Sequence, residues 1–179
     1  MTIVEQIKAE LEAFNAKKQA LVEQLRKEFP VMFKELFEQS EIIKSIGWVQ
    51  YSPYFNDGDE CTFSAHTDDL HVNGYDPDYD TVDWLSSYNY AKLQTEEDMV
   101  NNNMLAEKAN RSWYKDRQIG QEGLVINPNY NEKEANIYTQ FVDILSSIPD
   151  EFLEDLFGNH AQVTINNDGT ISVDGYDHD

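Results

Sequence analysis

The first 29 residues constrain the fold more than any other stretch, because they read as one uninterrupted helix. Apolar side chains recur at alternating spacings of three and four residues, and residues 2–29 contain neither Gly nor Pro. The apolar positions are Val4, Ile7, Leu11, Phe14, Leu21 and Leu25, with Lys18 as the polar interruption. This narrow stripe predicts either a coiled coil with a second copy or an amphipathic helix packed on its own domain.

A second helix is predicted after Pro30, which cannot donate a helical hydrogen bond. It covers Val31–Ser45, and Gly47 is expected to end it. Its apolar residues, among them Phe33 and Phe37, form a broad face that suits a protein core. Residues 1–45 are therefore expected to form an N-terminal helical region.

Strands are predicted next, where aromatic and β-branched residues alternate with turn residues. Trp48–Tyr54, Cys61–Ala65 and Leu70–Val72 are the expected strands, separated by turns at Asn56–Asp59 and Thr67–Asp69. The short turns predict a three-stranded antiparallel meander.

Residues 80–131 are expected to form a variable insert of helix and loop. Trp84–Leu93 is predicted to be a short helix, and a second helix begins with Thr95 as its N-cap. Tyr114–Asn131 contains two Gly and one Pro and is predicted to be mostly loop.

The C-terminal part repeats the order of helix and hairpin. Helices are predicted over 132–147 and from Pro149 to Phe157. Strands follow at Gln162–Ile165 and Thr170–Val173, joined by an Asn-Asp-Gly turn.

An internal repeat accompanies this order, because Leu70–Asp78 and Ile171–Asp179 share the pattern V-x-G-Y-D-x-D. The repeat indicates either a binding element used twice or a recurring strand exit, in which Gly supplies the backbone angle and Tyr packs on the sheet. Residues 46–179 are thus expected to form an α+β domain with two helix-hairpin units, 46–78 and 132–179. The predicted fold is α+β, with a long N-terminal helix and an antiparallel sheet whose helices pack on one face.

Negative charge is concentrated in two blocks. The net charge of the chain is −21, of which −11 lies in residues 51–100 and −10 in residues 132–179. Such a surface repels nucleic acid and anionic membranes and favours a protein partner with a basic surface. The candidate partner-binding residues are Asp57, Asp59, Glu60, Asp68, Asp69, Asp76, Asp78, Asp80, Asp174 and Asp177.

Metal and catalytic motifs are weak. Asp57, Asp59, Asp76 and Asp78 could hold a hard cation, but the EF-hand loop that begins at Asp76 lacks its Gly and Glu. The four histidines lack zinc-site spacing, and no nucleophile-elbow or phosphate-loop motif occurs. No catalytic residue, metal or cofactor is therefore expected.

Cys61 is the single cysteine, so an intramolecular disulfide cannot form, and a reducing cytoplasm is expected. Acidic neighbours do not activate a thiol, which makes Cys61 a candidate small core residue. The sequence also lacks an apolar run of roughly 20 residues and a signal-peptide core at its start.

The run Ile46–Ser64, which contains W-V-Q-Y-S-P-Y-F-N-D-G-D-E-C-T-F-S, resembles an uncharacterised family of small acidic proteins from bacteria and their phages. The ending Tyr176–Asp179, Y-D-H-D, and the long N-terminal helix are also similar to that family. The resemblance implies no activity, and it leads us to expect a phage-encoded protein acting in the host cytoplasm.

Together these features favour a non-enzymatic, oligomeric protein that binds a basic partner, for example a nucleic-acid-handling or defence protein bound by DNA mimicry. Three alternatives remain: the acidity serves solubility alone, the Asp clusters form a metal-dependent hydrolase, or a small ligand binds an aromatic pocket. The candidate pocket residues are Trp48, Tyr51, Tyr54 and Phe55.

Overall fold

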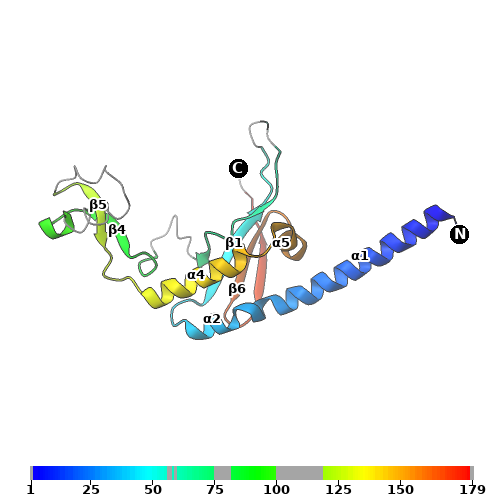
Figure 1. Ribbon diagram of the computed structural model, residues 1–179, viewed down its shortest axis with the longest axis horizontal. Coiled ribbons are helices and arrows are strands. Elements are labelled where there is room, and N and C mark those ends of the chain that lie inside the picture. Colours follow the sequence, from blue (N-terminus) through cyan, green and yellow to red (C-terminus); the bar gives the residue numbers. More distant parts are fainter. Residues whose placement is uncertain (1, 56–57, 59, 75–81, 100–118, 178–179) are drawn as a thin grey trace. The chain divides into compact units, whose positions relative to one another are not determined.

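The computed structural model describes residues 2–55, 58, 60–74, 82–99 and 119–177, and the chain forms two compact units (Figure 1). Unit 1 consists of Met1–Asp80 and Thr139–Asp179, and unit 2 consists of Thr81–Tyr138. Unit 2 is thus inserted into the chain of unit 1.

Helix α1 (Ile3–Glu28) confirms the long N-terminal helix. It begins with a reciprocal capping box, in which the Glu5 amide donates to Thr2 Oγ1 (3.3 Å) and the Thr2 amide donates to Glu5 Oε2 (2.6 Å). Arg26 and Lys27 lie in the last turn, where cations complement the helix dipole.

The predicted second helix is much shorter than expected. A 3₁₀ turn, η1 (Phe29–Phe33), carries Pro30 in its first turn, and α2 spans only Lys34–Gln39. Ser40 is extended, and its hydroxyl accepts from the Ile43 amide at 2.8 Å. The prediction of a helix to Ser45 was wrong because this side chain gives the backbone an alternative to the helical hydrogen bonds.

The sheet of unit 1 is built around β1 (Ser45–Tyr51). Along one edge β1 pairs antiparallel with β6 (Ala161–Asn166), which pairs in turn with β7 (Ile171–Gly175). Two short strands share the other edge. β2 (Ser64–Ala65) pairs with the end of β1 and β3 (His71–Val72) pairs with its start. The predicted antiparallel pairing of the first two strands is confirmed, but the meander is wrong in its third strand, because β3 pairs with β1 and not with β2.

Gly47 was predicted to end a helix, but it lies inside β1. Its backbone is buried, and a Cβ atom there would lie 2.8 Å from the Val163 carbonyl oxygen and 3.1 Å from Thr164 Oγ1. Gly47 therefore permits close approach of the two central strands.

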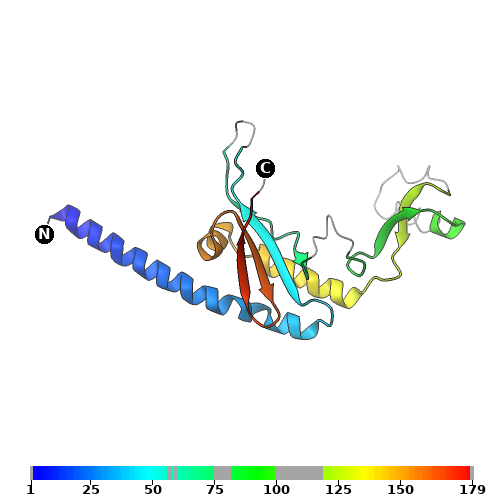
Figure 2. The ribbon, with the colours of Figure 1, turned by 180° about the vertical axis from the view of Figure 1, so that it is seen from behind.

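One face of this sheet carries the core. Ile46, Trp48 and Gln50 alternate along β1 on the buried face, and the residues of β6 alternate between buried and half-buried. Helices cover that face (Figure 2). They are η1, α2, α5 (Asp150–Phe157) and the part of α4 that belongs to unit 1, where α4 as a whole spans Glu132–Ser146. This is the predicted α+β fold with helices on one face.

Aromatic rings join these layers. The Phe29 ring lies 5.1 Å from Phe157 and 6.4 Å from Trp48, and the Phe33 ring lies 5.8 Å from Phe141. All of these side chains are buried. Edge and offset contacts of this kind add to the free energy gained by burying the rings.

Unit 2 contains a second antiparallel pair, β4 (Tyr88–Lys92) and β5 (Glu122–Ile126). The prediction of a short helix over Trp84–Leu93 is wrong, because Tyr88–Lys92 form β4. Tyr114–Asn131 is predicted to be mostly loop, and that prediction missed the strand β5. The expected N-cap is present: the Asp98 amide donates to Thr95 Oγ1 (3.1 Å) and the Thr95 amide donates to Asp98 Oδ2 (3.0 Å).

The C-terminal elements follow their predictions closely. α4, α5, β6 and β7 occupy the predicted ranges within a few residues. The two copies of the repeat differ where both are described. Val72 is buried beside β1, whereas Val173 is 41% exposed on β7. Gly74 has φ +83°, whereas Gly175 is an ordinary strand residue paired with Ala161.

Candidate interaction surfaces

Helix α1 presents an uncovered apolar stripe. Every residue from Thr2 to Leu21 is exposed, and none of the residues of α1 is buried. The side chains of the stripe that are more than half exposed are Val4, Ile7, Leu11, Phe14 and Leu21. The spacing places these side chains in line on one side of the helix, and this side faces solvent.

The stripe meets its own domain only toward the end of α1. Lys18 Nζ lies 2.7 Å from Asp155 Oδ1 on α5, and the Arg26 guanidinium lies 5.7 Å from the centre of the Phe157 ring. Leu25 is half-buried and lines an apolar pocket of about 260 Å³ with Phe152. The domain therefore covers the stripe at Leu25 and leaves its apolar side chains from Val4 to Leu21 exposed.

An isolated helix in water gains little stability beyond its own backbone hydrogen bonds, since most helical stability in proteins comes from packing an apolar face. The exposed side chains of Ile7, Leu11 and Phe14 form such a face. Covering them would stabilise α1 and remove apolar surface from water.

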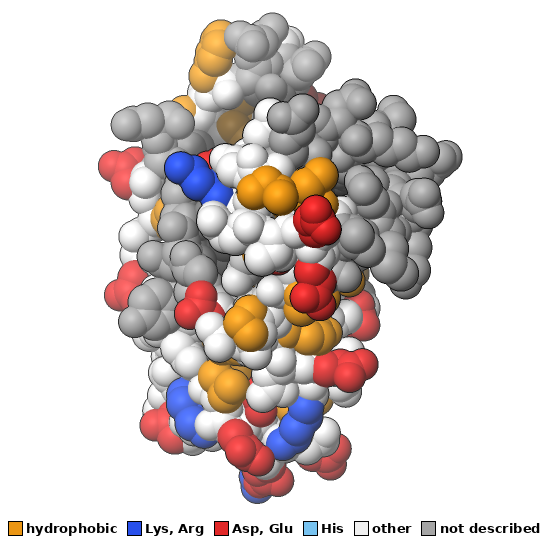
Figure 3. Space-filling view, turned by 90° about the vertical axis from the view of Figure 1, so that its left-hand side faces the viewer, with side chains coloured by type: hydrophobic (Ala, Val, Ile, Leu, Met, Phe, Trp, Pro, Cys, Tyr) orange, Lys and Arg blue, Asp and Glu red, His pale blue; other side chains and the backbone are white. Residues whose placement is uncertain are grey.

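The acidic candidates fall into two groups. Glu60, Asp68, Asp174 and Asp177 are exposed and Asp69 is half-buried. The other candidates, Asp57, Asp59, Asp76, Asp78 and Asp80, lie outside the described residues. In the view of Figure 3, acidic, basic and apolar side chains of the described residues are interspersed. The exposed candidates Glu60, Asp68, Asp174 and Asp177 are accessible to a partner.

Two carboxylates accept local hydrogen bonds that favour their charged form. Asp168 Oδ1 accepts from Thr170 Oγ1 (2.6 Å) and from the Thr170 amide (2.9 Å) in the turn between β6 and β7. The Thr170 hydroxyl, and secondarily its amide, lower the pKa of Asp168. The Gln94 amide and the Thr95 side chain likewise lower the pKa of Asp98.

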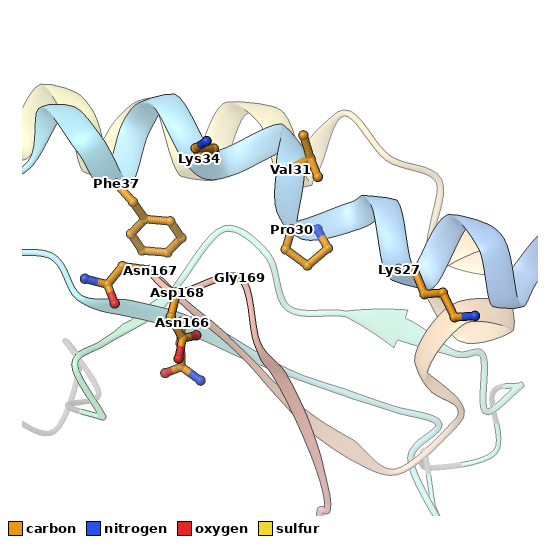
Figure 4. Close-up of a pocket in the computed structure, with 9 residues that line it drawn as sticks. All are labelled: Lys27, Pro30, Val31, Lys34, Phe37, Asn166, Asn167, Asp168 and Gly169. Carbon is orange, nitrogen blue, oxygen red and sulfur yellow. The ribbon is translucent and has the colours of Figure 1, made fainter.

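A cleft of about 280 Å³ separates the end of α1, η1 and α2 from the β6–β7 turn (Figure 4). Lys27 and Lys34 line it from the helical side and Asp168 from the turn, with the Phe37 ring directed toward the turn. Lys34 also lies 3.7 Å from Glu38. The mixed charge of this cleft defines no single class of ligand.

The aromatic candidates separate into structural and accessible residues. Trp48 is completely buried, and its indole Nε1 donates to Gln50 Oε1 at 2.9 Å. Gln50 Nε2 donates in turn to the carbonyls of Gly158 (2.6 Å) and Leu153 (3.2 Å). Gln50 therefore joins β1 to the end of α5, and Trp48, which is completely buried, orients the Gln50 side chain and does not line an open pocket.

Tyr51 and Tyr54 lie near histidines. The Tyr51 ring stacks on His66 at 4.7 Å and lies 5.5 Å from Tyr176, and the exposed Tyr54 ring stacks on His160 at 4.8 Å. Phe55 is 77% exposed. Tyr51 thus contacts two rings and Tyr54 one, and the cleft and the pocket described above are lined by other residues.

Metal-binding groups are not gathered within the described ranges, where no three His, Cys, Asp or Glu side chains lie close enough to hold an ion. The weak metal candidates Asp57, Asp59, Asp76 and Asp78 lie outside those ranges. Cys61 is exposed, so its prediction as a core residue was wrong. The reason is that β2 begins only at Ser64.

Asn73 is a structural residue that the sequence did not single out for this role. Its side-chain oxygen accepts from the amides of Lys44 (2.7 Å) and Ser45 (3.1 Å), and its Nδ2 donates to the Ile42 carbonyl (3.0 Å). Its φ is +54°, a conformation that Asn adopts more readily than most residues. The N-G dipeptide at 73–74 was the available signal.

Comparison with known proteins found no matching family model, curated protein or solved structure. Within the described residues, no helix has both the length and the apolar character needed to cross a membrane.

Proposed function

We propose that this protein is a non-enzymatic interaction protein with two binding surfaces. The first is the apolar stripe of α1, which binds another copy of the chain. The second is the acidic surface of unit 1, which binds a protein with a basic surface. The carrying observation is a helix of 26 residues without a buried residue, whose exposed apolar side chains follow a coiled-coil spacing.

The exposed acids support the second surface. Asp68, Asp174 and Asp177 lie on the loops and edge strand of unit 1 and are accessible to a partner. Complementary charge would speed association with a basic protein and discriminate against nucleic acid. A partner that normally binds DNA would make this surface a DNA mimic.

Self-association is tested by sedimentation of the full chain. The double variant Leu11→Ser/Phe14→Ser should shift the protein to monomer at concentrations where the wild type is oligomeric. Ala9→Ser/Ala16→Ser alters the opposite side of α1 and serves as the control, since Ala9 and Ala16 lie off the stripe and are exposed. A wild-type protein that is monomeric at high micromolar concentration contradicts this part of the proposal.

The acidic surface is tested by capture of proteins from a cell lysate at low and high salt. Asp68→Asn/Asp174→Asn/Asp177→Asn should lose a basic partner that high salt also releases from the wild type. Glu12→Gln/Glu23→Gln/Glu35→Gln removes the same charge from exposed helical positions and is the control. Equal capture by both triple variants means that the acidity acts through solubility. Competition by duplex DNA distinguishes DNA mimicry from other basic partners.

A further inference from the structure

We propose that α1 pairs with α1 of a second copy in an antiparallel orientation, with Leu11 packed against the partner's Phe14. This inference rests on the proposed self-association and specifies its geometry. It follows from the charges that flank the apolar stripe and from the part of the stripe that the chain's own domain covers.

The spacing assigns α1 to a heptad, in which core positions a and d alternate and positions e and g flank them. The core positions are Val4, Ile7, Leu11, Phe14, Lys18, Leu21 and Leu25. The g positions are Ile3, Glu10, Lys17 and Gln24, and the e positions are Lys8, Asn15 and Val22. These flanking residues decide the orientation of two paired helices.

A parallel pair is disfavoured by this pattern. Identical core residues would face each other, so Lys18 would oppose the partner's Lys18. Each g residue would meet the e residue of the following heptad, which brings Glu10 to Asn15 and Lys17 to Val22 of the partner subunit. A parallel pair would therefore contain a core repulsion and no compensating ion pair at these positions.

An antiparallel pair brings g residues against g residues. When Leu11 faces the partner's Phe14, Val4 faces the partner's Leu21, and Glu10 lies beside the partner's Lys17. By symmetry Lys17 also lies beside the partner's Glu10, so this register contains two opposite-charge pairs. The sequence of the stripe is thus complementary to itself when reversed.

The alternative antiparallel registers lose this complementarity. Shifting the helices by one heptad toward their N-termini opposes Glu10 to the partner's Glu10 and Lys8 to the partner's Lys8. Shifting them by one heptad the other way opposes Lys17 to the partner's Lys17 and requires Leu25, which is half-buried against its own domain, as a core residue. The proposed register ends at Leu21, before the covered part of the stripe.

Lys18, the polar interruption, fits the same arrangement. Its ammonium group lies 2.7 Å from Asp155 of α5. Its aliphatic stem remains available to cover the partner's Ile7, because a lysine can pack its methylene groups while its charge lies at the surface. The paired segment of 18 residues, Val4–Leu21, would extend over about 27 Å.

A charge exchange tests the orientation. Glu10→Lys and Lys17→Glu should each weaken the homodimer about tenfold, because each creates two like-charge pairs. An equimolar mixture of these two variants should pair as strongly as the wild type, since one chain then carries lysine at both positions and the other carries glutamate at both. The double variant Glu10→Lys/Lys17→Glu should also recover. If neither the mixture nor the double variant recovers, the proposed register is wrong.

A distance measurement checks the geometry independently. With Cys61→Ser removing the native thiol, spin labels on Gln6→Cys should lie roughly 20–25 Å apart in the antiparallel pair and about 15 Å apart in a parallel one. A dimer that depends on Leu11 and Phe14 but shows the short distance overturns the antiparallel arrangement and leaves the proposed function intact. Absence of any dimer contradicts both.

Discussion

The indole Nε1 of Trp48 donates to the side-chain oxygen of Gln50 at 2.9 Å, and both side chains are completely buried. They are two residues apart on a strand and therefore project from the same face of the sheet. Gln50 then uses its amide hydrogens to bind the Leu153 and Gly158 carbonyls at the end of α5. The W-x-Q pattern thus satisfies buried polar groups on two elements.

Replacing Gln50 by Leu should destabilise the protein by about 3 kcal/mol, because the indole N–H loses its acceptor and the carbonyls of α5 lose a donor. Gln162→Leu on β6 is the matched control, since Gln162 is only half-buried and its contact with His71 is long at 3.4 Å. Urea unfolding of both variants measures the difference. Equal losses for the two variants would show that the buried network contributes little.

Gly47→Ala should destabilise the protein by about 2 kcal/mol, because the added methyl group would lie 2.8 Å from the Val163 carbonyl oxygen and push β1 from β6. Gly175→Ala changes another strand glycine, where nothing lies within 4 Å of the added atom. Its effect should stay within about 0.5 kcal/mol. Thermal and urea unfolding of the two variants should therefore diverge, and coincident curves would contradict the close approach at Gly47.

Asn73 combines a positive φ with three side-chain hydrogen bonds at the start of β1. Asn73→Ala should lower the free energy of unfolding by about 2–3 kcal/mol, since it removes these bonds and retains a Cβ in the left-handed region. Asn73→Gly removes the same bonds and tolerates the backbone angle, so it should cost roughly 1 kcal/mol less. A glycine variant no more stable than the alanine variant would exclude backbone strain at this position.

Asp168 should make the free energy of unfolding depend on pH in the acid range. Its pKa in the folded protein is lowered from 3.8, first by the Thr170 hydroxyl and then by the Thr170 amide. The stabilisation is therefore fully present above the unfolded pKa and is lost as the pH falls through the lowered folded pKa. NMR titration of the carboxyl should show a midpoint below that of an unfolded control peptide. Thr170→Val should move it upward, and an unchanged midpoint in this variant would refute the assigned cause.

Elements with a clear local pattern could be predicted from the sequence. α1 follows from an unbroken stripe, α5 from Pro149 with its apolar face, and the β6–β7 hairpin from an Asn-Asp-Gly turn. The exposed stripe on α1 was also recognisable, although the sequence left open whether its own domain covered it.

The remaining elements depend on contacts distant in sequence. β4 and β5 are five residues each and pair across a long connection, with Tyr88 opposite Ile126, so neither segment carries a hairpin turn signal. Gly47 looked like a helix end because the reason for a glycine there is the Val163 carbonyl on another strand. The pairing of β1 with β2 across a short connection was predicted, whereas the return of β3 to the same edge of β1 carried no local signal.

The pairing of β1 with β6 has a consequence for how the chain folds during synthesis. Gln50 pairs with Ala161 and Ser45 with Asn166, so all of unit 2 is made between the two central strands. Closing so long a loop costs entropy before the contacts form, and such pairings fold slowly. The aromatic side chains of β1 and η1 therefore cannot be buried until β6 and α5 have left the ribosome. During that interval α1 can already form its backbone hydrogen bonds and its cap, because both are local in sequence.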